Sequence, residues 1–239
     1  SAFRSGLVDP NTADRGISPR TLVGDMRRRT LVAGAVGIAA SAAAGCLGAV
    51  GMDEYEATPA GVDPAVREET GYEQTAVEEQ VIERTVDAGV SEEITVRNYL
   101  TEHEKGVDLG PIGTVQAATF TVFTSPQISI AGRGFNPIAG MSTTELVEAM
   151  EADFERIENV EHVEDGETTV LGQSTPESLF EAEAGLDAGV SVDVNLHVTE
   201  SVETTDDHLV TIGVYPREVE AVEADNIAAM TSGVVESVE

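Results

Sequence analysis

The segment VSVDVNLHVT, residues 190–199, decides the fold class. Valine or leucine occupies every even position and a polar residue every odd position, which places the two kinds of side chain on opposite faces of a strand. The segment therefore predicts a strand with one apolar face and one solvent-facing side. His197 belongs to the polar positions, so we expect it to be exposed.

A second alternating segment follows the polar turn at residues 203–207. Val210, Ile212 and Val214 repeat the two-residue period. A short polar turn between two such segments favours an antiparallel hairpin with residues 190–199. Residues 115–124 are apolar at both odd and even positions, as expected for a central strand covered on both faces.

Other segments complete the predicted sheet. Residues 94–103, 169–173 and 179–184 are expected to be strands, with Pro176 separating the last two. Residues 75–86 are ambiguous, because Val77, Val81 and Thr85 have helical spacing while their β-branched content and the turn Ala88-Gly89 favour a long hairpin.

Two helices are expected. Ser142 and Glu145 form a capping box, in which each side chain bonds the other residue's backbone N–H. The apolar faces of the two helices are Leu146, Met150, Phe154 and Ile157 in the first, and Ile227, Met230, Val234 and Val238 in the second. The predicted fold is a single α+β domain over residues 62–239, an antiparallel sheet flanked by helices.

An export signal precedes this domain. Arg27, Arg28 and Arg29 are followed by an uncharged apolar run at 30–44, and small residues then lead to the only cysteine of the chain, Cys46. The order resembles a twin-arginine signal, with the pair Arg28 and Arg29, ending in a lipobox of Ala43, Ala44, Gly45 and Cys46. A lipid on Cys46 would hold the domain on the outer face of the cell membrane.

The rest of the N-terminal region is divided accordingly. We expect residues 1–45 to be an extension and signal, with Met26 as a possible true start, and residues 46–61 to be a flexible tether. Two alternatives remain open: an uncleaved transmembrane anchor over residues 30–52, which contain no charge, and an ordinary cleaved signal.

The charge of the exported part is extreme. Six of the 13 basic residues and three of the 44 acidic ones precede Cys46, which leaves seven basic and 41 acidic residues and a formal charge of −34. Such a chain repels itself unless salt screens its charges, a composition that resembles proteins of extreme halophiles. It is a poor partner for nucleic acid.

The search for reactive groups finds no catalytic motif. No two of the four histidines have zinc-binding spacing, and neither a nucleophile elbow nor a phosphate loop occurs, so we expect no cofactor and no metal. The loop at 132–137 holds Arg133, which could contact an anion or simply pair with a neighbouring acid.

Three segments carry a family resemblance. Residues 169–173, 190–198 and 210–216, the last before the closing helix, resemble a family of uncharacterised lipoproteins of halophilic archaea, over nearly all of 62–239. The order of elements is also similar to the photosystem II accessory P protein, an antiparallel sheet flanked by helices. Neither resemblance supplies catalytic residues, since a shared fold does not imply a shared function.

These observations favour a non-enzymatic surface module with a protein or small-molecule partner. The alternatives are an extracytoplasmic hydrolase with an unrecognised carboxylate site and the substrate-binding component of a transporter. A hydrolase would require a deep cleft with two or more buried acids, whereas a transporter component would require two lobes around a cleft.

Overall fold

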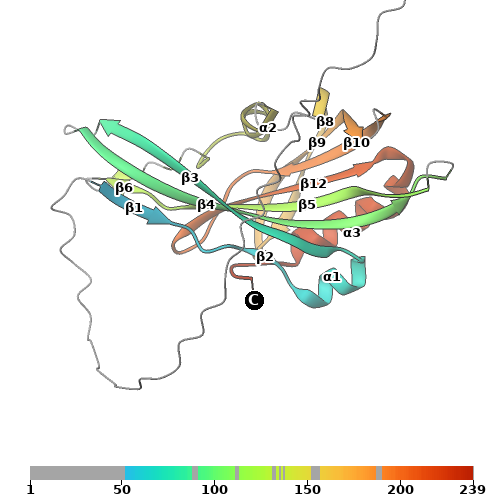
Figure 1. Cartoon of the computed structure of the whole chain (residues 1–239), viewed down its shortest axis with the longest axis horizontal. Coiled ribbons are helices and arrows are strands. Elements are labelled where there is room, and N and C mark those ends of the chain that lie inside the picture. Colours follow the sequence, from blue (N-terminus) through green and yellow to red (C-terminus); the bar gives the residue numbers. More distant parts are fainter. Residues whose placement is uncertain are drawn as a thin grey trace, which may run out of the picture. The chain divides into compact units, whose positions relative to one another are not determined.

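In the computed structural model, the described residues are 52–87, 91–110, 113–130, 133, 134, 136, 138–151, 157–186 and 190–238. They form one nine-stranded sheet with helices on both faces (Figure 1). The strand order is β1-β4-β5-β12-β10-β9-β8, with β3 also paired to β4 and β11 to β12. The strands are β1 Met52–Glu56, β3 Glu73–Asp87, β4 Ser91–Asp108, β5 Thr114–Pro126, β8 Ile157–Val170, β9 Gln173–Leu186, β10 Val190–Thr199, β11 Val202–Glu203 and β12 Asp207–Pro216.

Short elements complete the described part of the chain. The pairs β2 with β13 and β6 with β7 form two small antiparallel sheets. These strands are β2 Gly61–Val62, β13 Val234–Val235, β6 Ser129–Ile130 and β7 Arg133–Gly134; the helices are α1 Pro64–Thr70, α2 Thr143–Glu151, the 3₁₀ turn η2 Arg217–Val219 and α3 Glu220–Ser232.

The centre of the predicted sheet is confirmed. Strand β10 has the predicted bounds and pairs antiparallel with β12, while β5 lies between β4 and β12. The ambiguous segment 75–86 is part of β3, which forms the long hairpin with β4. The fold is mostly β rather than evenly α+β, and the sheet is mixed because β1 runs parallel to β4.

The sheet buries both of its faces, as β12 illustrates. Leu209 and Tyr215 belong to the core beneath α1 and α3, whereas Val210 and Ile212 pack with Leu146 of α2 on the opposite face. Gly213 allows α3 to approach the first face, because a Cβ there would lie 2.7 Å from Ile227. A single side chain at this position would therefore push the helix away from the sheet.

The polar face of β10 is solvent-facing only at its start, where Ser191 and Asp193 are exposed as predicted; beyond them the prediction is wrong. Asn195 and Thr199 are buried and His197 is half-buried. The alternation correctly predicted a strand but could not show what covers each face. Tyr215 of the neighbouring strand β12 hydrogen-bonds Asn195 and His197, so the later polar positions of β10 face the interior.

The predicted single strand at 169–173 is wrong. Leu171 and Gly172, with φ of 51° and 75°, form the two-residue turn between β8 and β9. Positive φ at both central residues is typical of a tight hairpin turn. Pro176 does not end a strand but lies within β9, where its carbonyl accepts the Glu200 N–H at 2.9 Å.

Both predicted helices are shorter than their apolar patterns. Ile157 begins β8 instead of continuing α2, and Phe154 lies outside the described residues. Helix α3 ends at Ser232, after which Val234 pairs with Val62. Apolar spacing continued past the helix because the following strand also buries a valine.

The predicted flexible tether at 46–61 is wrong for its second half. Residues 52–56 form β1, which pairs in register with residues 93–97 of β4, and Gly61 begins β2. Backbone hydrogen bonding to a neighbouring strand fixes a segment whose glycine and proline content suggested a linker.

Candidate functional site

Most of the predicted site residues lie outside the described part of the chain. These are the export residues Arg28 and Arg29, the lipobox residues Ala43, Ala44 and Gly45, and the lipid-bearing Cys46. Arg133, the predicted anion contact, begins β7 opposite Ile130, but its side chain is outside what the structure describes.

His103 has a structural role in β4. Its side chain is fully buried and its Nδ1 donates to the Phe120 carbonyl at 3.0 Å. Burial lowers the pKa of His103, so the ring is neutral at ordinary pH. Its Nε2 has no hydrogen-bond partner among the described residues.

His197 is half-buried and belongs to a group of polar side chains that contact one another. Its ring stacks on Tyr215, whose hydroxyl lies 3.1 Å from Nε2, and its Nδ1 lies 3.5 Å from a carboxylate oxygen of Glu177. Asn195 Nδ2 donates to the same hydroxyl at 3.3 Å. Tyr215 is only 1% exposed, so its hydroxyl has a structural role and is not accessible to a substrate.

Lys105, the only lysine of the chain, is also internal. Its Nζ lies 2.6 Å from Glu223 Oε1, and Tyr72 donates to the other oxygen of that carboxylate at 3.1 Å. Burial, followed by the charge of Glu223, raises the pKa of Tyr72, so the phenol stays protonated. This cluster joins β4, α3 and the segment after α1.

A cavity of about 410 Å³ lies between the start of α2 and the β8–β9 hairpin. Its walls come from three elements and are mostly hydroxyl and carboxylate groups. The lining residues are Ser142, Thr143, Thr144, His162, Asp165, Pro176, Glu177, Ser178 and Glu200.

Asp165 is the centre of a hydrogen-bonded chain in this cavity. Its Oδ1 lies 2.7 Å from His162 Nε2 and accepts the Ser178 hydroxyl at 2.7 Å. The Ser178 oxygen in turn lies 2.6 Å from the hydroxyl oxygen of Thr143 at the start of α2. The bonds from Ser178 and His162 lower the pKa of Asp165, which is therefore a carboxylate at neutral pH.

The order of this hydrogen-bonded chain differs from that of a serine hydrolase. In a serine hydrolase the histidine stands between the hydroxyl and the acid, where it takes the proton of the nucleophile. Here Asp165 stands between Ser178 and His162, so the histidine does not reach the hydroxyl directly. The arrangement can hold a ligand, and it is not that of a Ser-His-Asp triad.

The groups that line the cavity accept hydrogen bonds more readily than they donate them. Its described lining includes three carboxylates and no lysine or arginine. Asp165 Oδ2 and the Glu200 carboxylate have no hydrogen-bond partner among the described residues. Among those residues, no group of three or more histidine, cysteine, aspartate or glutamate side chains could hold a metal ion.

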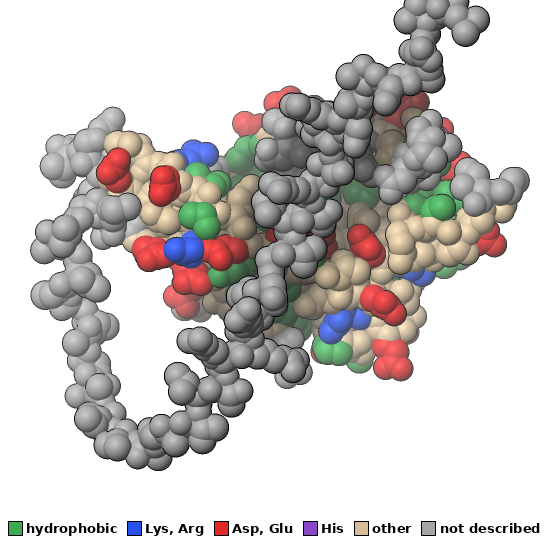
Figure 2. All heavy atoms as spheres, in the orientation of Figure 1, with side chains coloured by type: hydrophobic (Ala, Val, Ile, Leu, Met, Phe, Trp, Pro, Cys, Tyr) green, Lys and Arg blue, Asp and Glu red, His purple; other side chains and the backbone are tan. Residues whose placement is uncertain are grey.

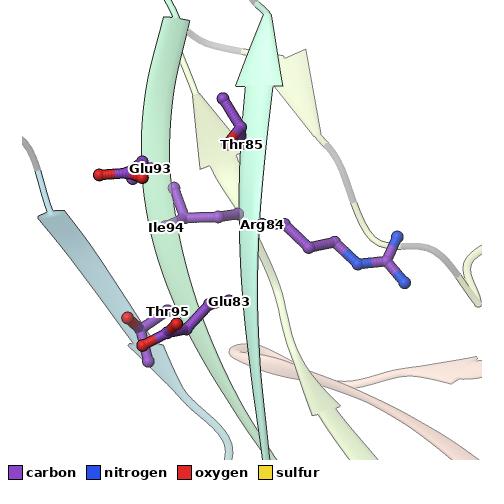
Figure 3. Close-up of a pocket in the computed structure, with 6 residues that line it drawn as sticks. All are labelled: Glu83, Arg84, Thr85, Glu93, Ile94 and Thr95. Atoms are coloured by element: carbon purple, nitrogen blue, oxygen red, sulfur yellow. The ribbon is translucent and has the colours of Figure 1, made fainter.

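A second cavity, of about 290 Å³, lies on the β3–β4 hairpin. Its lining comes from two neighbouring strands: Glu83, Arg84, Thr85, Glu93, Ile94 and Thr95. In Figure 3 Arg84 points to the opposite side of the hairpin from Glu83 and Thr95, so its guanidinium does not converge with these groups. The first cavity is the better candidate because its groups come from separate elements.

Sequence patterns missed His162, Asp165 and Ser178. The acidic segment from Ile157 to Val170 lacks apolar alternation, so it was not recognised as a strand. The available local signal was the capping box, which placed Ser142 and Glu145 correctly at the start of α2. Only the pairing of β8 with β9 brings Asp165 opposite Ser178.

Acidic side chains are spread over the face drawn in Figure 2, where basic ones are few. None of the helices in the described ranges combines the length and the apolar character that spanning a membrane requires.

Comparison with known proteins identifies a family but no activity. No curated protein matches this chain. The model of a domain of unknown function, DUF6517, matches residues 59–235, from the segment before β2 to β13. The match spans most of the chain, which therefore belongs to the DUF6517 family.

Proposed function

We propose that the protein is an exported lipoprotein of a halophile, held at the outer face of the cell membrane, and that its domain binds a hydrophilic ligand without catalysis. The ligand would occupy the cavity between α2 and the β8–β9 hairpin. The observation that carries the binding proposal is the set of carboxylate and hydroxyl groups converging there from three elements.

The location rests on the N-terminal sequence. Arg28 and Arg29 precede an uncharged apolar run, and Cys46 follows small residues, in the order that lipoprotein export requires. The halophilic assignment rests on the charge of −34 from Cys46 onward, which concentrated salt would screen. The resemblance to lipoproteins of halophilic archaea and the likeness to the photosystem II accessory P protein both stay predictions.

The ligand chemistry follows from the lining. Carboxylates only accept hydrogen bonds, and the Thr143 and Ser178 hydroxyls already bond to each other. A complementary ligand therefore carries N–H or O–H donors, such as an amine or a polyol. Neither the hydrolase nor the transporter alternative gains specific support. The two acids whose pKa burial raises, the half-buried Glu102 and the buried Asp207, do not line this cavity.

A binding assay tests the cavity. Ethanolamine, spermidine, arginine and glycerol are added separately to the protein in molar KCl, and thermal unfolding is followed by circular dichroism. A ligand at 100 times its Kd stabilises the folded state by about 2.7 kcal/mol. Asp165→Asn and Glu200→Gln should weaken the stabilisation, whereas Glu218→Gln on η2, outside the cavity, should not. Stabilisation that persists in both cavity variants would place binding elsewhere.

A fractionation experiment tests the anchor. Cys46→Ser removes the sulfur that would carry the lipid, so the domain should leave the membrane fraction and appear in the soluble one. Continued membrane retention with an uncleaved N-terminus would favour the transmembrane alternative. This result is independent of ligand binding.

A further inference from the structure

Strands β3 and β8 are the two long edge strands of the large sheet, in which the short strands β1 and β11 also pair on one side only. Within the described ranges, β3 pairs only with β4 and β8 only with β9. Each edge strand leaves one row of backbone N–H and C=O groups without a strand partner. Such a row is a template for pairing with another chain unless irregularities or charges prevent it.

The β8 edge is irregular. Its register with β9 shifts between Glu158 and Glu161 and again between His162 and Glu164. Asn159 adds a positive φ of 56°. Bulges of this kind twist an edge strand and interrupt the ladder that a partner strand would need.

The β3 edge is regular over most of its length. Its one irregularity lies between Gln74 and Ala76, after which pairing with β4 continues without a shift to Asp87. Val77 and Val81 are 40% and 49% exposed. Four residues apart in a strand, they point to the same face, so this edge combines a continuous backbone ladder with two exposed apolar side chains.

We propose that β3 pairs antiparallel with β3 of a second copy of this chain, with Glu79 of each copy opposite the other at the two-fold axis. In this register Val77 of each copy lies opposite Val81 of its partner, so four exposed valines form two apolar cross-strand pairs. Apolar pairs of this type contribute favourably to strand association. In the same register Gln74 lies opposite Arg84, so this cross-strand pair brings no like charges together.

The charge on the axis is partly compensated. Two Glu79 carboxylates would face each other, but Arg97 of each copy forms ion pairs with its own Glu79 and, at 2.5 Å, with Glu54. A register centred on Gln80 would place Val77 opposite Glu83. One centred on Val81 would place Glu79 opposite Glu83, and Glu83 has no ion pair of its own among the described residues. The register centred on Glu79 therefore best matches both the valines and the arginine.

Salt governs this association. Each copy has a formal charge of −31, so two copies repel each other in dilute buffer. At ~1 M salt the Debye length is ~3 Å, so charges of the two copies interact only where they are in contact across the interface. The dimer is therefore expected in molar KCl, the same condition that favours the folded domain.

Light scattering tests the interface. The full chain with Cys46→Ser, in molar KCl at high micromolar concentration, should have twice the monomer mass of 25.1 kDa. Val77→Glu combined with Val81→Glu should give a monomer with an unchanged circular dichroism spectrum. Val163→Glu is the matched control, because Val163 is 45% exposed on β8 and should leave the dimer intact. A monomeric parent chain, or a dimer that survives the double substitution, would overturn the proposal.

Disulfide cross-linking tests the register without relying on a charge substitution. In the Cys46→Ser chain, Glu79→Cys should cross-link to itself, because directly opposite Cα atoms lie about 4.5–5.5 Å apart. Val77→Cys should not cross-link to itself, since the two copies would be about 13 Å apart along the strands. A mixture of Val77→Cys and Val81→Cys chains should form the mixed dimer. Self-cross-linking of Val77→Cys without that of Glu79→Cys would contradict the assigned register.

Discussion

Asp207, at the start of β12, is a buried carboxylate with an incomplete set of hydrogen bonds. Its Oδ2 accepts the Thr58 N–H at 3.1 Å, while Oδ1 has no partner among the described residues. Burial raises the pKa of Asp207, so the folded state holds this proton more tightly than the unfolded state. Ionisation of Asp207 therefore lowers stability as pH rises from the ordinary pKa range of aspartate through the raised pKa of the folded state.

Asp207→Asn should stabilise the protein. The amide oxygen can still accept the Thr58 N–H, and the cost of a buried charge disappears, which we expect to be about 1 kcal/mol at neutral pH. The gain should be smaller at pH 4 than at pH 7, because the raised pKa leaves more of the native carboxyl protonated at the lower pH. Denaturant unfolding at both pH values measures it. Asp206→Asn, at the exposed neighbour, makes the same change in net charge and should give little of this gain.

Lys105→Met should destabilise the protein, because it leaves Glu223 buried without its cation. A fully buried pair loses ~3–5 kcal/mol in this way, and we expect about 2 kcal/mol here because the Lys105 side chain is 19% exposed. Adding Glu223→Gln should recover most of the loss. Arg217→Met is the control, since its pair with Glu181 is exposed and should contribute less than ~1 kcal/mol. Equal losses for the two basic residues in chemical denaturation would contradict the internal role of Lys105.

At the scale of one element, α2 depends on its capping box. The Ser142 N–H and hydroxyl both donate to Glu145 Oε2 at 2.9 Å, and the Glu145 N–H donates to the Ser142 hydroxyl at 3.3 Å. The same turn carries Thr143, which contacts the cavity residue Ser178. The cap therefore fixes one wall of the proposed ligand site.

Ser142→Ala should cost about 1 kcal/mol of stability, since it removes the side-chain cap of the first helical turn. It should also weaken any ligand binding in the cavity more than Thr144→Ala does, because Thr144 is exposed and does not take part in the cap. Thermal unfolding with and without ligand separates the two effects. Equal behaviour of the two variants would show that the cap does not order the site.

At the scale of the whole molecule, charge repulsion should make folding depend on salt. Reducing KCl from molar to ~0.01 M lengthens the Debye distance from ~3 to ~30 Å, so the 34 unbalanced charges repel across the domain. We expect the circular dichroism spectrum to change to that of an unfolded chain. Lowering the pH to protonate carboxylates should restore structure at low salt, whereas sucrose of equal osmolarity should restore less. A spectrum that is insensitive to dilution would exclude this electrostatic dependence.

Local sequence patterns predicted the structure correctly where the spacing of the buried residues matches the period of the secondary structure. The valines of β10, the apolar segment of β5 and the capping box of α2 were predicted correctly because each is a local relation. The acidic strand β8 was missed because most of its side chains are exposed, and β1 was assigned to a tether because its strand partner lies far along the chain. Of the candidate site, only the start of α2 was predictable.

The sequence by itself determined the intense negative charge, the central strands and the turn and cap residues, since these depend on composition or on neighbours a few positions apart. Tertiary structure alone decided that Tyr215 of β12 lies against the polar positions of β10, where it hydrogen-bonds Asn195 and His197. It also brought Thr143, Asp165 and Ser178 together. The physical reason is that alternation indicates which residues share a face, whereas only packing between distant segments decides what lies against that face.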